Sequence, residues 1–142
     1  MATRYHRVNL DGLSIYQTET YPTAAANNAG KFVKIVAKKF ATAVAADVGA
    51  AQLYILEVQH QTGLAILDAI PVGESAIGNY VQEGRVFAAR AASGLTFKKD
   101  DPVYLTATGT ITATVAADMQ PVGYSQDDVT LTQDDFVMIR IK

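Results

Sequence analysis

Apolar and polar residues alternate along this chain at the two-residue period of a half-buried β-strand. The alternation is clearest in residues 110–115, where threonines alternate with apolar residues, and again in residues 136–141. Residues 85–91 are rich in alanine, but their short length between Gly84 and Gly94 favours a strand over a helix. Other short runs of β-branched and aromatic residues lie at 32–36, 53–58, 76–81 and 103–105. Many short strands at regular spacing predict an all-β barrel or sandwich.

An internal repeat divides this pattern into two related β-units. The motif Val-Ala-Ala-Asp occurs at residues 44–47 and again at residues 115–118. The segments before each copy correspond as well: 32–35 matches 102–105, and 40–42 matches 111–113. We therefore expect a small β-barrel domain that is built from two copies of one unit, with a middle segment between them.

The first 29 residues lack a long alternating run and contain turn signals such as Asp11-Gly12 and Tyr21-Pro22. Their tyrosines distinguish them from a disordered leader, which contains few aromatic residues. Two interpretations fit these facts. The first is an extended N-terminal arm (1–29) that becomes ordered against a partner, followed by a β-barrel domain (30–142). The second is an N-terminal strand of the same domain.

Composition narrows the class of protein. A chain of 142 residues can bury a core of its own, but much of its 49% hydrophobic content is alanine, and tryptophan is absent. We therefore expect a thin core and added stability from association with other chains. Because the net charge is −2, the chain lacks the basic character of a nucleic-acid-binding protein, and nucleic acid is not an expected partner.

The absence of cysteine excludes a disulfide framework, a thiolate zinc site and a cysteine nucleophile. Residues 1–7 contain no apolar signal core, and no run approaches the length that spans a bilayer. The expectation is a soluble protein that has no membrane partner and is assembled in the cytoplasm.

Acidic residues gather toward the C-terminus. From residue 100 onward the chain contains seven aspartates, and its basic residues there are Arg140 and Lys142. Aspartate is favoured in turns, so a set of acidic turns is the first interpretation. A calcium site is the alternative, but the Asp-Asp pairs lack the alternating ligand spacing of an EF-hand loop. We expect no metal site.

No group of residues has the pattern of a catalytic site. His6 and His60 lie in polar, turn-like stretches without an acid and a hydroxyl nearby in sequence. Phosphate-binding glycine loops are absent, so we expect neither an enzyme nor a cofactor. Two other classes stay open. One is a lipoyl- or biotinyl-type carrier, for which Lys38-Lys39 is the candidate, and the other is a carbohydrate-binding or adhesion module.

The stretch from residue 80 to residue 105 carries a resemblance to a known family. A glycine turn precedes Val-Phe-Ala-Ala-Arg-Ala-Ala-Ser-Gly (86–94), and Lys-Lys-Asp-Asp-Pro-Val-Tyr-Leu (98–105) follows. This block resembles the central part of tailed-bacteriophage head decoration (cement) proteins. The family usually has Gly-Asp before its Pro-Val strand, where this chain has Asp100-Asp101.

Residues 119–125 and 136–141 resemble later strands of the same family, so the resemblance covers about residues 30–142. It implies a β-tulip-like barrel that assembles as a homotrimer. It also implies binding to the major capsid protein on the outer surface of an icosahedral head, where the protein would stabilise the shell as part of the virion. Such a role needs broad contacts repeated by symmetry rather than reactive groups.

The resemblance also suggests a role for the arm, which could add a strand to a sheet edge of the capsid. Three linked arms would raise a modest affinity by about 10²-fold or more. Deleting residues 1–29 would then leave a folded domain that no longer binds heads. The candidate capsid-contact residues of the arm are Arg4, Tyr5, Arg7, Leu13, Ile15, Tyr16 and Tyr21.

Overall fold

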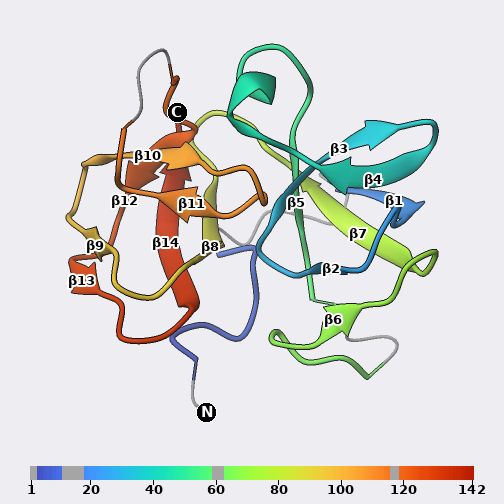
Figure 1. Cartoon of the computed structure of the whole chain (residues 1–142), viewed down its shortest axis with the longest axis horizontal. Coiled ribbons are helices and arrows are strands. Elements are labelled where there is room, and N and C mark those ends of the chain that lie inside the picture. Colours follow the sequence, from blue (N-terminus) through green and yellow to red (C-terminus); the bar gives the residue numbers. More distant parts are fainter. Residues whose placement is uncertain (1–2, 11–17, 59–62, 116–118) are drawn as a thin grey trace.

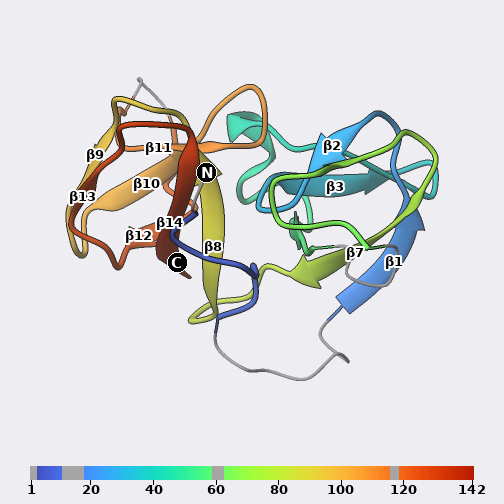
Figure 2. The ribbon, with the colours of Figure 1, turned by 90° about the horizontal axis from the view of Figure 1, so that it is seen from below.

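The computed structural model describes residues 3–10, 18–58, 63–115 and 119–142. Within these ranges the chain is all-β, apart from one short 3-10 helix, η2 (Ala45–Asp47). The strands form two lobes that lie side by side (Figures 1 and 2). Because one lobe contains a closed barrel, the prediction of an all-β fold with a small barrel is confirmed.

The first lobe, called here the first unit, consists of β1 to β7. Its main sheet is antiparallel and has the strand order β1-β7-β5-β3-β4, and β2 pairs with β6 beside it. In the described residues the bounds of these strands are β1 (Thr18–Pro22), β2 (Asn27–Asn28), β3 (Phe32–Val36), β4 (Lys39–Thr42), β5 (Tyr54–Leu56), β6 (Ala69–Ile70) and β7 (Ser75–Tyr80).

The second lobe, the second unit, consists of β8 to β14. Its barrel has the order β10-β11-β8-β14-β12 and is antiparallel except where β11 meets β8 at the pair Ile111–Ala91. Its strands, as far as the structure describes them, are β8 (Val86–Ala91), β9 (Thr96–Phe97), β10 (Pro102–Leu105), β11 (Ile111–Thr112), β12 (Gly123–Ser125), β13 (Val129–Thr130) and β14 (Asp135–Ile141).

The two units repeat one topology. In each unit the first strand pairs with the seventh, the seventh with the fifth, the fifth with the third, and the third with the fourth. The second strand pairs with the sixth in both units. The predicted matches of residues 32–35 with 102–105 and of 40–42 with 111–113 fall on β3 and β10 and on β4 and β11. The prediction of two related β-units is therefore confirmed, but the expected middle segment between them is wrong: β6 and β7 belong to the first unit and β8 to the second.

The sheet of the first unit is buried on both faces. Phe32 and Ile55 belong to the main core, which also contains the barrel of the second unit. Their sequence neighbours Val33, Tyr54 and Leu56 belong to a smaller cluster inside the first unit. Because successive side chains of a strand point to opposite faces, β3 and β5 contact both clusters. The first unit therefore relies on the second unit to cover one of its faces.

Two glycines let the units approach each other closely. Gly109, in the β10–β11 loop, has a φ of 79°, and a Cβ there would lie 2.8 Å from the carbonyl oxygen of Phe32. Gly30 has a φ of 83°, and a Cβ there would lie 2.5 Å from the Phe136 ring. Because both positions combine a left-handed backbone with a close contact, other residues are disfavoured at this seam.

The alternating residues 110–115 form less strand than predicted. Pairing of β11 with β10 is limited to Ile111 and Thr112, and Val115 is 60% exposed. The last pair of this ladder is Tyr104–Thr112, so residues 113–115 have no partner in β10. The alternation of residues therefore continues past the point where pairing stops.

Residues 18–29 were expected to belong to an extended arm, but they lie inside the first unit. β1 pairs with β7 over its whole length, from Thr18–Asn79 to Pro22–Ser75, and β2 pairs with β6. A division at residue 30 would separate both strands from their partners. For these residues the structure of the chain matches the alternative interpretation, an N-terminal strand of the same domain.

Candidate functional site

Arg4 and Tyr5 are held against the second unit by one carboxylate. Arg4 Nη2 lies 3.1 Å from Asp127 Oδ2, and the Tyr5 hydroxyl donates a hydrogen bond to the same oxygen at 3.0 Å. The backbone N–H of Met138 also donates to Asp127, at 2.8 Å. Burial and the hydrogen bond to Asp127 raise the pKa of the Tyr5 hydroxyl. In the isolated chain both candidates are therefore engaged by the fold itself.

The N-terminal segment also pairs with the outer edge of β8 through an isolated antiparallel bridge, Asn9–Phe87. The N–H of Ala88 donates to the carbonyl of Val8 at 2.8 Å, and the N–H of Leu10 donates to the carbonyl of Val86 at 3.1 Å. The side chain of Val8 is fully buried. Figure 2 shows this segment, in dark blue, running along β8. It covers a strand edge that would otherwise be open to pairing with another chain.

Glu57 joins the same segment to the first unit. Its Oε1 accepts a hydrogen bond from the Val8 N–H at 2.8 Å, and its Oε2 accepts one from the Asn9 N–H at 2.9 Å. Asn79 Nδ2 donates to Oε2 at 3.3 Å. Sequence reasoning did not identify Glu57 or Asp127 as anchors. The signal for Glu57 is weak: it is the single acid in the apolar run 53–58.

Arg7 is exposed, as is its neighbour His6. These two residues line an open recess of about 460 Å³ together with Arg4, Tyr5 and Leu10. The recess combines two guanidinium groups with an aromatic ring and an apolar side chain. Such a surface suits contact with an acidic or aromatic patch on another protein.

The structure does not bring the seven candidate contact residues together. Tyr21 lies in β1, and its ring meets the Phe40 ring edge-on, with centroids 5.8 Å apart and planes at 86°. It packs against the smaller cluster of the first unit and is not part of the Asp127 network that holds Arg4 and Tyr5. Leu13, Ile15 and Tyr16 lie outside the described residues.

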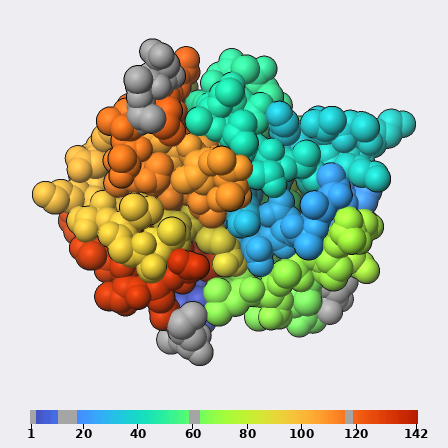
Figure 3. Space-filling model, viewed as in Figure 1, coloured from blue at the N-terminus to red at the C-terminus, as the bar shows by residue number. Residues whose placement is uncertain are grey.

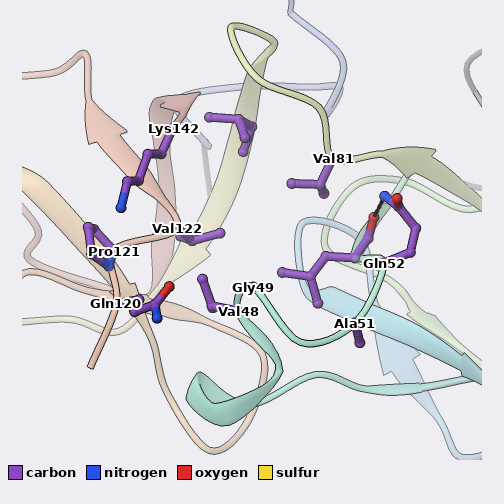
Figure 4. Close-up of a pocket in the computed structure, with 11 residues that line it drawn as sticks. Val48, Gly49, Ala51, Gln52, Val81, Gln120, Pro121, Val122 and Lys142 are labelled. Atoms are coloured by element: carbon purple, nitrogen blue, oxygen red, sulfur yellow. Dashed lines mark hydrogen bonds between the residues drawn. The ribbon is translucent and has the colours of Figure 1, made fainter. Parts of the chain in front are cut away.

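A groove lies between the two units near the end of β14. Residues 48–53 of the first unit and 120–122 of the second line it, with Val81, Ile141 and Lys142, and its volume is about 300 Å³ (Figure 4). Its described lining contains amides, a lysine and apolar side chains, but no acid, histidine or hydroxyl. The groove can therefore hold a neighbouring surface, but it offers no acid–base pair.

Several of the described aspartates behind the calcium alternative have partners within the fold. Asp127 binds Arg4 and Tyr5, and Asp135 Oδ1 accepts hydrogen bonds from the N–H groups of Arg4 and Phe136. Among the residues that the structure describes, no group of three or more His, Asp or Glu side chains could hold a metal ion. His60 lies outside these residues.

Lys38 lies at the tip of the β3–β4 hairpin. Ala37 and Lys38 have φ angles of 50° and 61°, which are the angles of a tight two-residue hairpin turn. Both residues are exposed. A hairpin tip is the position that a carrier lysine requires. The carrier alternative stays a prediction, and an intact mass with or without a covalent adduct would decide it.

The fold and these surfaces define an all-β scaffold of two like units, whose candidate site is a contact surface along the N-terminal segment. No described helix is long and apolar enough to cross a membrane. No model of a known protein family matches the chain, and no curated protein matches it.

Among solved structures, the chain is similar to the N-terminal base of the head fiber protein gp8.5 of bacteriophage phi29. The TM-score is 0.55 and the identity is 12%, over 88% of this chain and 92% of that chain. At this level of identity the likeness shows a shared fold, so a functional relationship has to be argued separately.

Proposed function

We propose that this chain is a structural protein of a bacteriophage head, which binds the outer surface of the capsid and stabilises the shell. The observation that carries this proposal is the similarity in fold, over 88% of the chain, to the base of a phage head fiber. The resemblance of residues 80–105 to head decoration proteins supports the same role. The first comparison uses the arrangement of strands, and the second uses the order of residues.

The proposed partner is the major capsid protein, and the proposed oligomer is a homotrimer. A decoration protein gains affinity from identical contacts repeated by symmetry, so each contact can be modest. Exposed apolar side chains are available for contacts of this kind. They are Val36, Val72 and Val115, with exposures of 50%, 64% and 60%.

Within the N-terminal segment, we propose Arg7 and the recess around it as the capsid contact. Arg4 and Tyr5 are bound to Asp127, so their contribution would require breaking bonds within the chain. Arg7 is exposed and could bind an acidic patch without such a change. Leu13, Ile15 and Tyr16 follow shortly in the sequence and would extend the contact.

Co-sedimentation with emptied phage heads that lack their own decoration protein tests the proposal. Arg7→Ala should weaken binding by about tenfold or more, because every copy in a trimer loses its contact at once. Lys98→Ala, which removes an exposed cation of the second unit, is the control and should bind like the unchanged protein. If the unchanged protein does not sediment with heads, the capsid role is wrong. If Arg7→Ala binds at full strength, the contact lies elsewhere.

The structure changes the design of the deletion experiment. Removing residues 1–29 would remove β1 and β2, so loss of binding could reflect an unfolded first unit. Point variants of the exposed segment avoid this problem. Sedimentation equilibrium of the free protein tests the oligomer separately, and a monomer at micromolar concentration would contradict the homotrimer.

A further inference from the structure

A cavity at the seam between the two units brings two cations together. Its volume is about 310 Å³, and it lies on the face shown in Figure 3, where the β10–β11 loop (orange) meets the segment between β2 and β3 (blue). It is separate from the N-terminal recess and from the groove of Figure 4. The side chains that matter in its lining are those of Asn28, Lys31, Arg90, Thr108, Thr110 and Asp134.

Backbone hydrogen bonds fix Lys31 next to Arg90. The N–H of Arg90, in β8, donates to the carbonyl of Gly30 at 2.9 Å across the seam. The carbonyl of Lys31 accepts a hydrogen bond from the N–H of Leu56 at 3.1 Å. Backbone hydrogen bonds therefore fix the positions of the two cationic residues.

The guanidinium of Arg90 is also fixed. Its Nε donates to the carbonyl of Ala29 at 3.1 Å, and its Nη2 donates to the carbonyl of Ile66 at 3.0 Å. Its Cζ lies 4.8 Å from the centroid of the Phe136 ring, which it stacks upon. Nη1 forms no hydrogen bond with the described residues. Arg90 thus contributes a positive charge at a defined position.

In the part of the chain that the structure describes, the Lys31 ammonium forms no ion pair, whereas the charges of Asp134 and Asp135 favour the charged form of Arg90. Asp134 is the one acid of the described lining, and its Oδ1 accepts a hydrogen bond from the Ser93 N–H at 2.9 Å. Burial and the nearby charge of Arg90 lower the pKa of Lys31. Two neighbouring cations destabilise each other unless an anion lies close to both.

We propose that this cavity binds a small oxyanion, a phosphate or a carboxylate group, between Lys31 and Arg90. The Lys31 ammonium provides a compact positive charge with three hydrogen-bond donors. The Arg90 guanidinium provides a positive charge at a fixed position. The amide of Asn28 can donate a further hydrogen bond to the oxygens. The hydroxyls of Thr108 and Thr110, which contact each other and Thr106 at 2.8–3.3 Å, can turn to do the same. This site does not depend on the proposed role at the capsid.

Thermal unfolding and ¹⁵N NMR titration of the full chain test the site, with inorganic phosphate as the probe and sodium chloride of equal ionic strength as the reference. Phosphate should raise Tm above the value in chloride and should shift the amide signals of Lys31 and Arg90 in a saturable way. Lys31→Gln should lose about tenfold or more in phosphate affinity, as expected for a charged hydrogen-bond donor. Lys39→Gln, which removes an exposed lysine of β4, is the matched control and should keep the affinity.

Equal Tm values in phosphate and chloride, or unchanged affinity in Lys31→Gln, would overturn the proposal. Without an oxyanion, in chloride, Lys31→Gln should be at least as stable as the unchanged chain, because it removes the repulsion from Arg90. A clear loss of Tm in chloride would mean that the lysine stabilises the fold directly, and this would also overturn the proposal. Repeating the titration with acetate separates the two sources of the oxyanion. Equal shifts with acetate favour a carboxylate of a partner, and shifts with phosphate alone favour a phosphate.

Discussion

In the second unit, β8 and β11 close the barrel through the parallel pair Ala91–Ile111, whereas the corresponding strands of the first unit meet at an isolated parallel bridge between Thr23 and Phe40. The outer edge of β8 is covered by the N-terminal segment. The first unit also differs in its smaller cluster, where aromatic rings meet each other. The Phe40 and Tyr54 centroids lie 5.7 Å apart, and those of Tyr54 and Tyr80 lie 5.0 Å apart.

This difference shows how one topology can be completed in two ways. The main core contains the barrel of the second unit and also side chains of the first unit such as Phe32 and Ile55. Large aromatic rings fill the other face of the first-unit sheet. We therefore expect the second unit to be the more stable part and the first unit to depend on it.

The largest effect should come from removing a ring at the seam. Phe136 is fully buried, and its ring stacks on the Arg90 guanidinium and lies close to Gly30. Phe136→Ala should lower the free energy of unfolding by about 3–5 kcal/mol and should expose both units to hydrogen exchange. Chemical denaturation combined with exchange detected by mass spectrometry measures both quantities.

Phe40→Ala is the matched variant in the first unit, since Phe40 is 1% exposed. The loss of free energy should be similar, but faster exchange should be confined to β3, β4 and β7. If Phe40→Ala accelerates exchange in β8 and β14 to the same extent, the two clusters unfold as one core. The distinction drawn between the units would then be wrong.

The second effect concerns the close approach at Gly109. Gly109→Ala combines a left-handed φ with a contact on the carbonyl of Phe32, and we expect a loss of about 2–4 kcal/mol. Gly94→Ala is the control, because Gly94 has a φ of 84° and nothing within 4 Å of the added methyl. Gly94→Ala should lose about 1 kcal/mol. The difference between the two variants then gives the cost of the close contact with Phe32 alone. Equal losses would show that the loop can move away from Phe32.

The sequence allowed the strands and the repeat to be predicted, because both leave local signals. Alternation and turn residues predicted β14. The matching segments identified β10 as the counterpart of β3, and β11 as the counterpart of β4. β3 and β5 are less regular, since residues such as Phe32 and Val33 are both buried, one on each face. That pattern indicates a strand, but it does not reveal that a second unit covers the other face.

The site was harder to predict, because its anchors are far apart in the sequence. Nothing local links Asp127 to Arg4, or Glu57 to Val8, and the same holds for Arg90 and Lys31. β1 was expected to belong to an arm because residues 1–29 lack a long alternating run and contain tyrosines, which suit contact with a partner. Its pairing with β7 depends on residues more than fifty positions away.

A third effect should appear at the edge of β8. Asp127→Asn keeps the shape of the side chain but removes the ion pair with Arg4, so the N-terminal segment should detach at a loss of about 1–2 kcal/mol. Exchange at the Ala88 N–H, which donates to Val8, should become faster. Asp128→Asn, at a neighbouring exposed position, is the control and should leave that amide protected. Unchanged protection in Asp127→Asn would mean that pairing with β8 holds the segment by itself.

The smallest effect is expected at Asp47, in the copy of the repeated motif that the structure describes. Asp47 Oδ1 accepts a hydrogen bond from Lys34 Nζ at 2.8 Å, and Oδ2 accepts one from the Val44 N–H at 2.9 Å. The Lys34 bond and then the Val44 bond lower the pKa of this carboxyl below its ordinary value of 3.8. Because the folded-state pKa is the lower one, the contribution is fully present above the unfolded-state pKa and is lost as pH falls through the folded-state pKa.

Asp47→Asn should therefore lower the free energy of unfolding at neutral pH by about 0.5–1 kcal/mol, a small value because solvent screens the pair. The difference from the unchanged chain should shrink below pH 4 and vanish in stronger acid. Denaturation curves across this range, with Asp68→Asn as a control at an exposed position of the first unit, measure the effect. A difference that stays constant with pH would assign the loss to the shape of the turn rather than to its charge. The motif at residues 44–47 would then define the end of β4 through its backbone alone.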